Sequence, residues 1–166
     1  MKATIHLSTA LTAVLLLFAA GCASPRSGAD SNRAVVRRYF DRWANHADVA
    51  VADALIVPDL ELINPPSRLT SLADYKRSMA GFHEAFPDLR FDVEELIAEG
   101  DRVVARWTFH GTNRGAFLGQ PPTGRTVTFT GTSTFRLRDG RIHQIWVNMD
   151  RHGMLQQLGL LPQPPH

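Results

Sequence analysis

The sequence of 166 residues predicts an α+β domain in which helices pack on one face of a strongly curved antiparallel sheet. Two patterns predict this class. The first half of the chain repeats its apolar residues at helical spacing, whereas from residue 89 onward apolar and polar residues alternate with the period of two typical of strands. Helices that cover one face of a curved sheet enclose a cone, so we expect a pocket inside it.

The N-terminus, residues 1–21, resembles an export signal. Met1-Lys2 precede an uncharged apolar run of about eleven residues, which is shorter than the roughly 20 residues of a membrane-spanning helix. Small residues before Cys22, the only cysteine, resemble a bacterial lipobox, in which Cys22 is lipidated. Ordinary signal-peptidase cleavage nearby is the alternative. We therefore expect an exported lipoprotein of the bacterial cell envelope that contacts the membrane only through its lipid anchor.

After the signal we expect a polar tether over residues 22–31 and one domain over residues 32–166, a length that fits a single core. One cysteine cannot form an internal disulfide, and a lipidated sulfur cannot act as a nucleophile. The balance of 18 basic against 16 acidic residues gives no support to nucleic-acid binding. A small molecule is the expected partner.

The helical half contains capping residues ahead of apolar stripes. Ser31-Asn32 predicts the start of a first helix in which Val36, Phe40 and Trp43 share a face. The same reasoning predicts a second short helix from Asp48 to Val57, a strand over 60–64, and a third helix that starts at Ser71 and ends before Pro87. The third helix carries an aromatic stripe that we assign to the core: Tyr75, Met79, Phe82 and Phe86.

The strand half predicts runs near residues 89–93, 103–110, 127–135 and 144–150, separated by turns such as Gly100-Asp101 and Asp139-Gly140. In the last run, polar or amphipathic side chains alternate with apolar ones. Because alternate residues of a strand share a face, we expect one face to line the pocket with Gln144, Trp146, Asn148 and Asp150.

Several segments, taken in order and spacing over residues 32 to 160, together resemble the SnoaL-like polyketide cyclases and ester cyclases of the nuclear transport factor 2-like superfamily. These segments are Ala85-Phe86-Pro87-Asp88-Leu89, Ala98-Glu99-Gly100-Asp101-Arg102-Val103, Gly111-Thr112-Asn113-Arg114-Gly115, Pro121-Pro122-Thr123-Gly124, Phe135-Arg136-Leu137, Asp139-Gly140-Arg141-Ile142, Trp146 with Asp150, and Gln157-Leu158-Gly159.

The resemblance implies a cone-shaped α+β barrel, a homodimer formed through the sheet, and an apolar pocket. It also implies closure of a polyketide ring by intramolecular aldol condensation, without a metal or an organic cofactor. The family's acid/base lies in a Trp-x-x-x-Asp segment, which places the role on Asp150. This chain departs from the family in having Asn113 near the usual histidine and Gln144 at the usual glutamate.

For such chemistry a carboxylate needs a raised pKa, which burial beside Trp146, Phe129 and Phe135 would provide for Asp150. His110, Asn148 and Trp146 are the expected donors to a developing enolate. The alternative role for Asp150 is the N-cap of a final helix over 151–158.

Further candidates for ligand contact lie on neighbouring elements. Arg106 shares a strand face with His110, and His83 lies one residue past the aromatic stripe of the third helix. Asn64 ends an early strand at the expected mouth of the cone, and Phe117 lies in a loop over 115–124 that forms either a lid or a flexible hairpin connection. The histidines lack the short spacing of metal ligands, so we expect no metal site.

Three functions are consistent with these residues. The first is a cofactor-independent cyclase acting on an apolar carbonyl compound, with Asp150 as base. The second is a lipid-anchored binding module without chemistry, which export and the loss of two titratable groups favour. The third is an isomerase or epoxide hydrolase in which Arg106 orients water.

Overall fold

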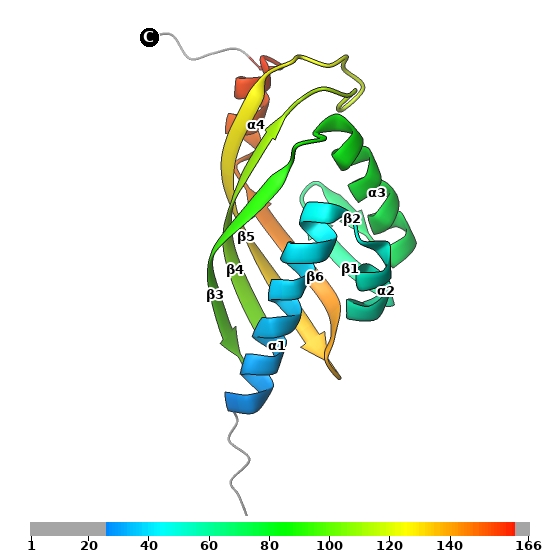
Figure 1. Ribbon diagram of the computed structural model, residues 1–166, viewed down its shortest axis with the longest axis vertical. Helices are drawn as coiled ribbons and strands as arrows, with labels where there is room; N and C mark the ends of the chain where they lie inside the picture. The colour runs from blue at the N-terminus through cyan, green and yellow to red at the C-terminus, as the bar shows by residue number, and fades with distance from the viewer. Residues whose placement is uncertain (1–25, 162–166) are drawn as a thin grey trace, which may run out of the picture.

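The computed structural model describes residues 26–161. Helices α1, α2 and α3 lie on one side of a curved six-stranded sheet, and α4 lies near the end of the chain at one end of the sheet (Figure 1). In chain order the elements are α1 (Arg26–Arg38), the π-helix η1 (Tyr39–Ala44), α2 (Val49–Leu55), β1 (Ile56–Asn64), β2 (Ser67–Leu69), α3 (Leu72–Ala85), β3 (Arg90–Glu99), β4 (Arg102–Thr112), β5 (Thr126–Arg138), β6 (Arg141–Met149) and α4 (Arg151–Leu158).

The sheet has the strand order β2-β1-β6-β5-β4-β3. All neighbours are antiparallel except β1 and β6, which run parallel. The predicted α+β class, with helices on a curved sheet, is confirmed, and the sheet differs from the expected antiparallel one only in its parallel β1–β6 pair. The parallel pair joins segments some 80 residues apart, which no local pattern reveals. The sheet stays open, since β2 and β3 form its two edges.

The first helix begins earlier than expected. Helix α1 starts at Arg26, and the predicted cap residue Asn32 instead donates from its side-chain amide to the Gly100 carbonyl oxygen at 3.0 Å. Residues 26–31 are therefore helical and do not belong to the tether. The export signal, Cys22 and the start of the tether lie outside the described residues, and dimerisation through the sheet stays a prediction.

The two other predicted helix starts are confirmed. The Asp48 side chain accepts a hydrogen bond from the Val51 amide at 3.2 Å, and the Ser71 hydroxyl accepts one from the Asp74 amide at 3.1 Å. Each bond satisfies a backbone donor that has no partner inside its helix. These caps fix where α2 and α3 begin, and thereby how they lie across the sheet.

The core lies between the helices and the inner face of the sheet. On β4 the side chains of Val103, Ala105, Trp107 and Phe109 are buried and alternate with more exposed residues, as the period of two predicts. Rings from η1, α3 and the strands meet at centroid distances of 4.7 to 6.2 Å. Over residues 26–161, no helix is both long enough and apolar enough to cross a membrane.

Helix α4 is hydrogen-bonded to the first part of β5 through one side chain. The Gln157 side chain donates from Nε2 to the Thr128 carbonyl oxygen at 2.8 Å and accepts from the Thr128 amide at 2.9 Å. Strand β6 pairs with β5 only from Gly131 onward, so Thr128 lies beyond the last paired residue. The amide of Gln157 thus takes the place of a strand neighbour.

Candidate functional site: an apolar cavity with neutral polar groups

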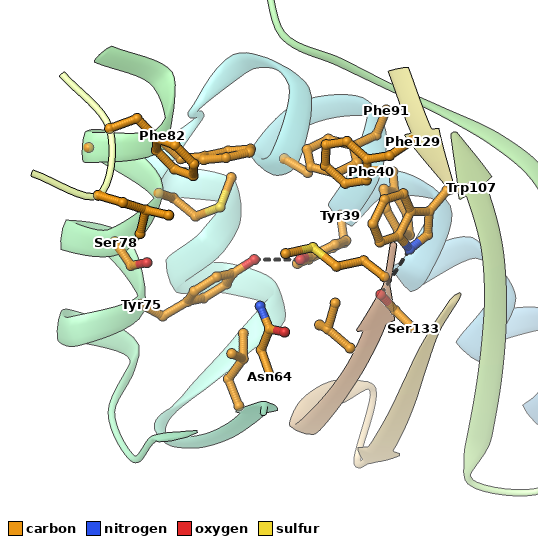
Figure 2. Close-up of a pocket in the computed structure, with 18 of the residues that line it drawn as sticks. Tyr39, Phe40, Asn64, Tyr75, Ser78, Phe82, Phe91, Trp107, Phe129 and Ser133 are labelled. Carbon is orange, nitrogen blue, oxygen red and sulfur yellow. Dashed lines mark hydrogen bonds between the residues drawn. The ribbon is translucent and has the colours of Figure 1, made fainter. Parts of the chain in front are cut away.

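An apolar cavity of about 400 Å³ lies between the inner face of the sheet and the helices η1 and α3 (Figure 2). Aromatic and aliphatic side chains form most of its wall. The wall residues come from η1 (Tyr39, Phe40, Ala44), β1 (Leu62, Asn64), α3 (Tyr75, Ser78, Met79, Gly81, Phe82), β3 and β4 (Phe91, Trp107), the following loop (Ala116, Phe117, Leu118), and β5 and β6 (Phe129, Ser133, Val147, Met149). Its size suits a small organic molecule.

Two phenols meet in the wall of this cavity. The hydroxyl of Tyr39 on η1 is hydrogen-bonded to the hydroxyl of Tyr75 on α3, as Figure 2 shows. The two residues are 6 % and 5 % exposed. Burial raises the pKa of Tyr75 and raises the pKa of Tyr39 further, where the neighbouring Tyr75 adds to the effect. Both phenols are therefore protonated at neutral pH.

A second polar pair lies on the sheet side of the cavity. Trp107 Nε1 donates to the Ser133 hydroxyl at 3.0 Å (Figure 2). The indole lies directly over Gly131, where an added Cβ would lie 2.4 Å from the ring. Glycine at this position therefore makes room for the ring that holds Ser133. Asn64 adds an amide to the wall, and Ser78 adds a fourth hydroxyl after those of Tyr39, Tyr75 and Ser133.

The predicted ligand contacts Asn64, Phe117 and Phe129 lie in this wall. Phe117 comes from the loop between β4 and β5, and packs on Phe86 with a centroid distance of 5.2 Å. The base of that loop is fixed by buried Asn113, whose side chain donates to the Gly115 carbonyl oxygen at 2.8 Å and accepts from the Thr123 amide at 2.8 Å. Asn113 therefore has a structural role next to the cavity.

Strand β6 presents to the cavity the face opposite to the one we expected. Val147 and Met149 line the cavity and Ile145 is fully buried, so Trp146 and its alternate neighbours point to the outer face of the sheet. There the Arg136 guanidinium lies 5.8 Å from the centroid of the Trp146 ring. The apolar set faces inward because burial of its hydrocarbon against the helices is more favourable than burial of an amide and a carboxylate.

Asp150 lies outside the cavity. It is exposed, follows the end of β6, and caps α4 by accepting a hydrogen bond from the Gly153 amide at 2.8 Å. The expected placement among Trp146, Phe129 and Phe135 is wrong, since Trp146 lies on the outer face while Phe129 and Phe135 face inward. The alternative role as a helix cap is the one that the structure shows.

The other expected polar contacts also lie on the outer face or away from the cavity. His110 Nδ1 shares a hydrogen bond with Thr128 Oγ1 at 3.1 Å, and Arg106 forms ion pairs with Glu94 and Glu95. Asn148 is exposed. Gln144 donates to Glu61 and accepts from Arg136 at 3.2 Å. None of these four belongs to the cavity wall.

His83 of α3 forms a hydrogen bond to the backbone of η1. Its Nε2 donates to the Ala44 carbonyl oxygen at 3.1 Å, at the end of η1. Its ring is partly buried, and desolvation lowers its pKa. His83 thereby holds α3 against η1, next to the cavity but outside its wall. Among residues 26–161, no three His, Cys, Asp or Glu side chains are placed to hold a metal ion.

The sequence reasoning missed the polar groups that the cavity does contain: Tyr39, Tyr75, Ser78, Trp107 and Ser133. The helical spacing of Tyr75 predicts a place in an apolar stripe and gives no signal for its hydroxyl. The sequence does contain a signal for Ser133 as a cavity residue. Ser133 is the one hydroxyl residue on the face of residues 127–135 that also carries Val127, Phe129 and Phe135.

An open cone of α+β class with an interior apolar pocket defines a member of the nuclear transport factor 2-like fold. The chain belongs to the SnoaL-like polyketide cyclase family, whose model matches residues 33–158. No curated protein sequence matches it.

Solved structures agree with this fold. AclR from Streptomyces galilaeus, proposed to be a hydroxylase, is 31% identical, with a TM-score of 0.74 over 82% of this chain and 86% of AclR. A proposed SnoaL-like polyketide cyclase from Jannaschia sp. CCS1 is 26% identical, with a TM-score of 0.75 over 81% of this chain and 96% of its own. IdmH from Streptomyces antibioticus, a proposed polyketide cyclase, is 28% identical, with a TM-score of 0.68 over 77% and 98% of the two chains.

The capping role of Asp150 predicts different effects for two substitutions. Asp150→Ala should lower the free energy of unfolding by about 1 kcal/mol, because the Gly153 amide loses its acceptor, whereas Asp150→Asn should change it little, because asparagine caps equally well. Denaturant unfolding measures both. A loss of ligand binding or turnover in Asp150→Asn, with stability intact, would instead show that the carboxylate has a chemical role.

The two tyrosines of the chain both lie in the cavity, so they can be titrated without interference from others. The folded protein should show no tyrosinate absorbance at about pH 10, the usual pKa of a free tyrosine, whereas the chain unfolded in guanidinium should titrate there.

Because the unfolded chain then releases phenolic protons that the folded protein keeps, the free energy of unfolding should fall as the pH rises above about 10. Tyrosinate absorbance near pH 10 in a protein whose circular dichroism is still native would contradict the burial of the pair.

Proposed function

We propose that this domain binds a neutral, mainly apolar small molecule and holds one carbonyl oxygen of it against the Tyr39–Tyr75 pair. The observation that carries this proposal is the pair of buried phenols in the wall of an otherwise apolar cavity. Burial of hydrocarbon supplies most of the affinity in such a pocket, and a few polar groups fix the orientation of the ligand.

The hydrogen-bond inventory of the pair favours an acceptor in the ligand. Two phenols carry two O–H donors, and one of these is used in the bond between Tyr39 and Tyr75. The other remains for the ligand. Since the raised pKa values keep both protons in place, the pair offers a donor over a wide range of pH. A carbonyl or ether oxygen satisfies this donor, and leaving it buried without an acceptor would cost free energy.

Binding is favoured over catalysis by the chemistry of the wall. Aldol closure needs a base that removes a proton from carbon. The wall residues in the described part of the chain are neutral: phenols, hydroxyls, an amide, an indole, two thioethers and hydrocarbon. The candidate base Asp150 caps α4, and Arg106, which would have oriented water for epoxide hydrolysis, is paired on the outer face.

Cyclase-type activity is the second candidate, and family membership together with the phenol pair favours it. A protonated phenol pair is suited to stabilise a developing enolate oxygen, as an oxyanion-binding group does. The proton from carbon would then pass to water or to a group of the substrate itself. Polyketide-like carbonyl compounds are the ligand class to test for both candidates, since the family model describes polyketide cyclases and IdmH is proposed to be one.

Removal of one phenolic hydroxyl should affect ketones selectively. Tyr75→Phe should weaken the binding of anthrone and androstanone about fivefold, which corresponds to one neutral hydrogen bond, and should leave the binding of anthracene and androstane unchanged. Calorimetric titration measures the four affinities. Equal loss for ketone and hydrocarbon would refute the oxygen-binding role, and failure of all four to bind would refute the pocket as a ligand site. Turnover of a ketone would favour the second candidate.

We also propose that the protein is exported and anchored through a lipid on Cys22, which the lipobox-like segment before this residue supports. In bacteria fed an alkyne-tagged fatty acid, the protein should be labelled and should fractionate with membranes. The variant Cys22→Ala should lose both label and membrane association. A labelled or still membrane-bound Cys22→Ala variant would contradict the anchor, and a soluble, unlabelled natural protein would favour ordinary cleavage.

A further inference from the structure

Ser133 is a polar residue on an apolar strand face. On β5 the inward side chains are Val127, Phe129, Ser133, Phe135 and Leu137, and all five are buried. Ser133 itself is 4 % exposed and belongs to the cavity wall. A buried hydroxyl on such a face costs free energy unless it has partners, so its hydrogen bonds indicate what it is for.

Trp107 accounts for only part of the hydrogen-bonding capacity of Ser133. The indole N–H is a donor only, so in their bond of 3.0 Å the Ser133 oxygen must accept. A hydroxyl that accepts still has its own proton to donate. Among residues 26–161, Ser133 Oγ makes one side-chain hydrogen bond, the one it accepts from Trp107. Its proton is therefore available to an acceptor inside the cavity.

The ring of Trp107 is held firmly in the orientation that this bond requires. Gly131 leaves space for the indole on β5, and Phe91 packs edge-on against it with a centroid distance of 5.2 Å. Trp107 is itself 3 % exposed. The indole therefore has little freedom to turn away, and it keeps one lone pair of Ser133 occupied.

We propose that Ser133, positioned by Trp107, is a second oxygen-binding residue of the cavity, and that the cavity selects apolar ligands with two acceptor oxygens over ligands with one. The phenol pair contacts the first oxygen and the Ser133 hydroxyl contacts the second. The two donors lie on opposite layers of the fold, since Tyr39 and Tyr75 belong to the helices and Ser133 to the sheet (Figure 2). Apolar wall between them suits the hydrocarbon that joins two carbonyl groups. This inference rests on the function proposed above.

The test compares diketones with monoketones of the same skeleton. The first pair of probes is anthraquinone and anthrone, and the two oxygens of anthraquinone lie close together, across one ring. The second pair is androstanedione and androstanone, and the two oxygens of androstanedione lie at opposite ends of the skeleton. We expect at least one diketone to bind the full-length protein about fivefold more tightly than its monoketone, the effect of one further neutral hydrogen bond. Ser133→Ala should abolish that preference and leave the monoketone affinity unchanged.

Two further variants separate a specific contact from a general loss of structure. Trp107→Phe keeps a ring over Gly131 but removes the N–H, so the preference for the diketone should shrink while Ser133 is still present. Thr132→Ala removes a hydroxyl from the neighbouring residue of the same strand, on the opposite face, and should leave the preference unchanged. The ratio of diketone to monoketone affinity is the readout, because a merely destabilised protein would lose both affinities together.

The inference is overturned if the diketones bind no more tightly than the monoketones, or if Ser133→Ala weakens both ligands equally. In either case monoketone binding that depends on Tyr75 would leave the proposed function intact. If no ketone binds, the proposed function fails as well, and the two failures are thereby distinguished.

Discussion

The packing of η1 on the inner face of the sheet is the contact on which the cavity depends. Tyr39 and Phe40 both pack on Phe135 of β5, with centroid distances of 5.0 and 5.9 Å, and Phe40 reaches Phe91 of β3 at 6.1 Å. The i to i+5 hydrogen bond from the Asn45 amide to Phe40 ends the π-helix. Because this segment is held against the sheet, the Tyr39 hydroxyl meets the hydroxyl of Tyr75, and the pair forms part of the cavity wall.

The sequence predicts the elements of this fold better than the way they face one another. Caps at Asp48 and Ser71 and the alternation in β4 are local signals, and they are correct because each depends on neighbours in the chain. The start of α1 and the parallel pairing of β1 with β6 depend on contacts distant in sequence. These contacts leave no local pattern to read.

The orientation of β6 shows why the candidate site was harder to predict. Its two alternating sets both include a large apolar side chain, so period two defines two faces without saying which one is inside. The helices decide this, because Val147 and Met149 complete the wall that they cover. With β6 in this orientation, Asp150 lies outside the cavity as the N-cap of α4. The polar groups inside the cavity belong to side chains that a sequence pattern assigns to the core.

The double hydrogen bond between Gln157 and Thr128 bears on solubility. Where β6 ends, β5 continues without a strand neighbour on that side, and a strand edge of this kind is a template for pairing with another chain. The side-chain amide of Gln157 carries the same donor and acceptor as a peptide group, and it occupies this edge at Thr128. Helix α4 thereby covers a stretch of β5 at which the backbone of another chain could otherwise pair.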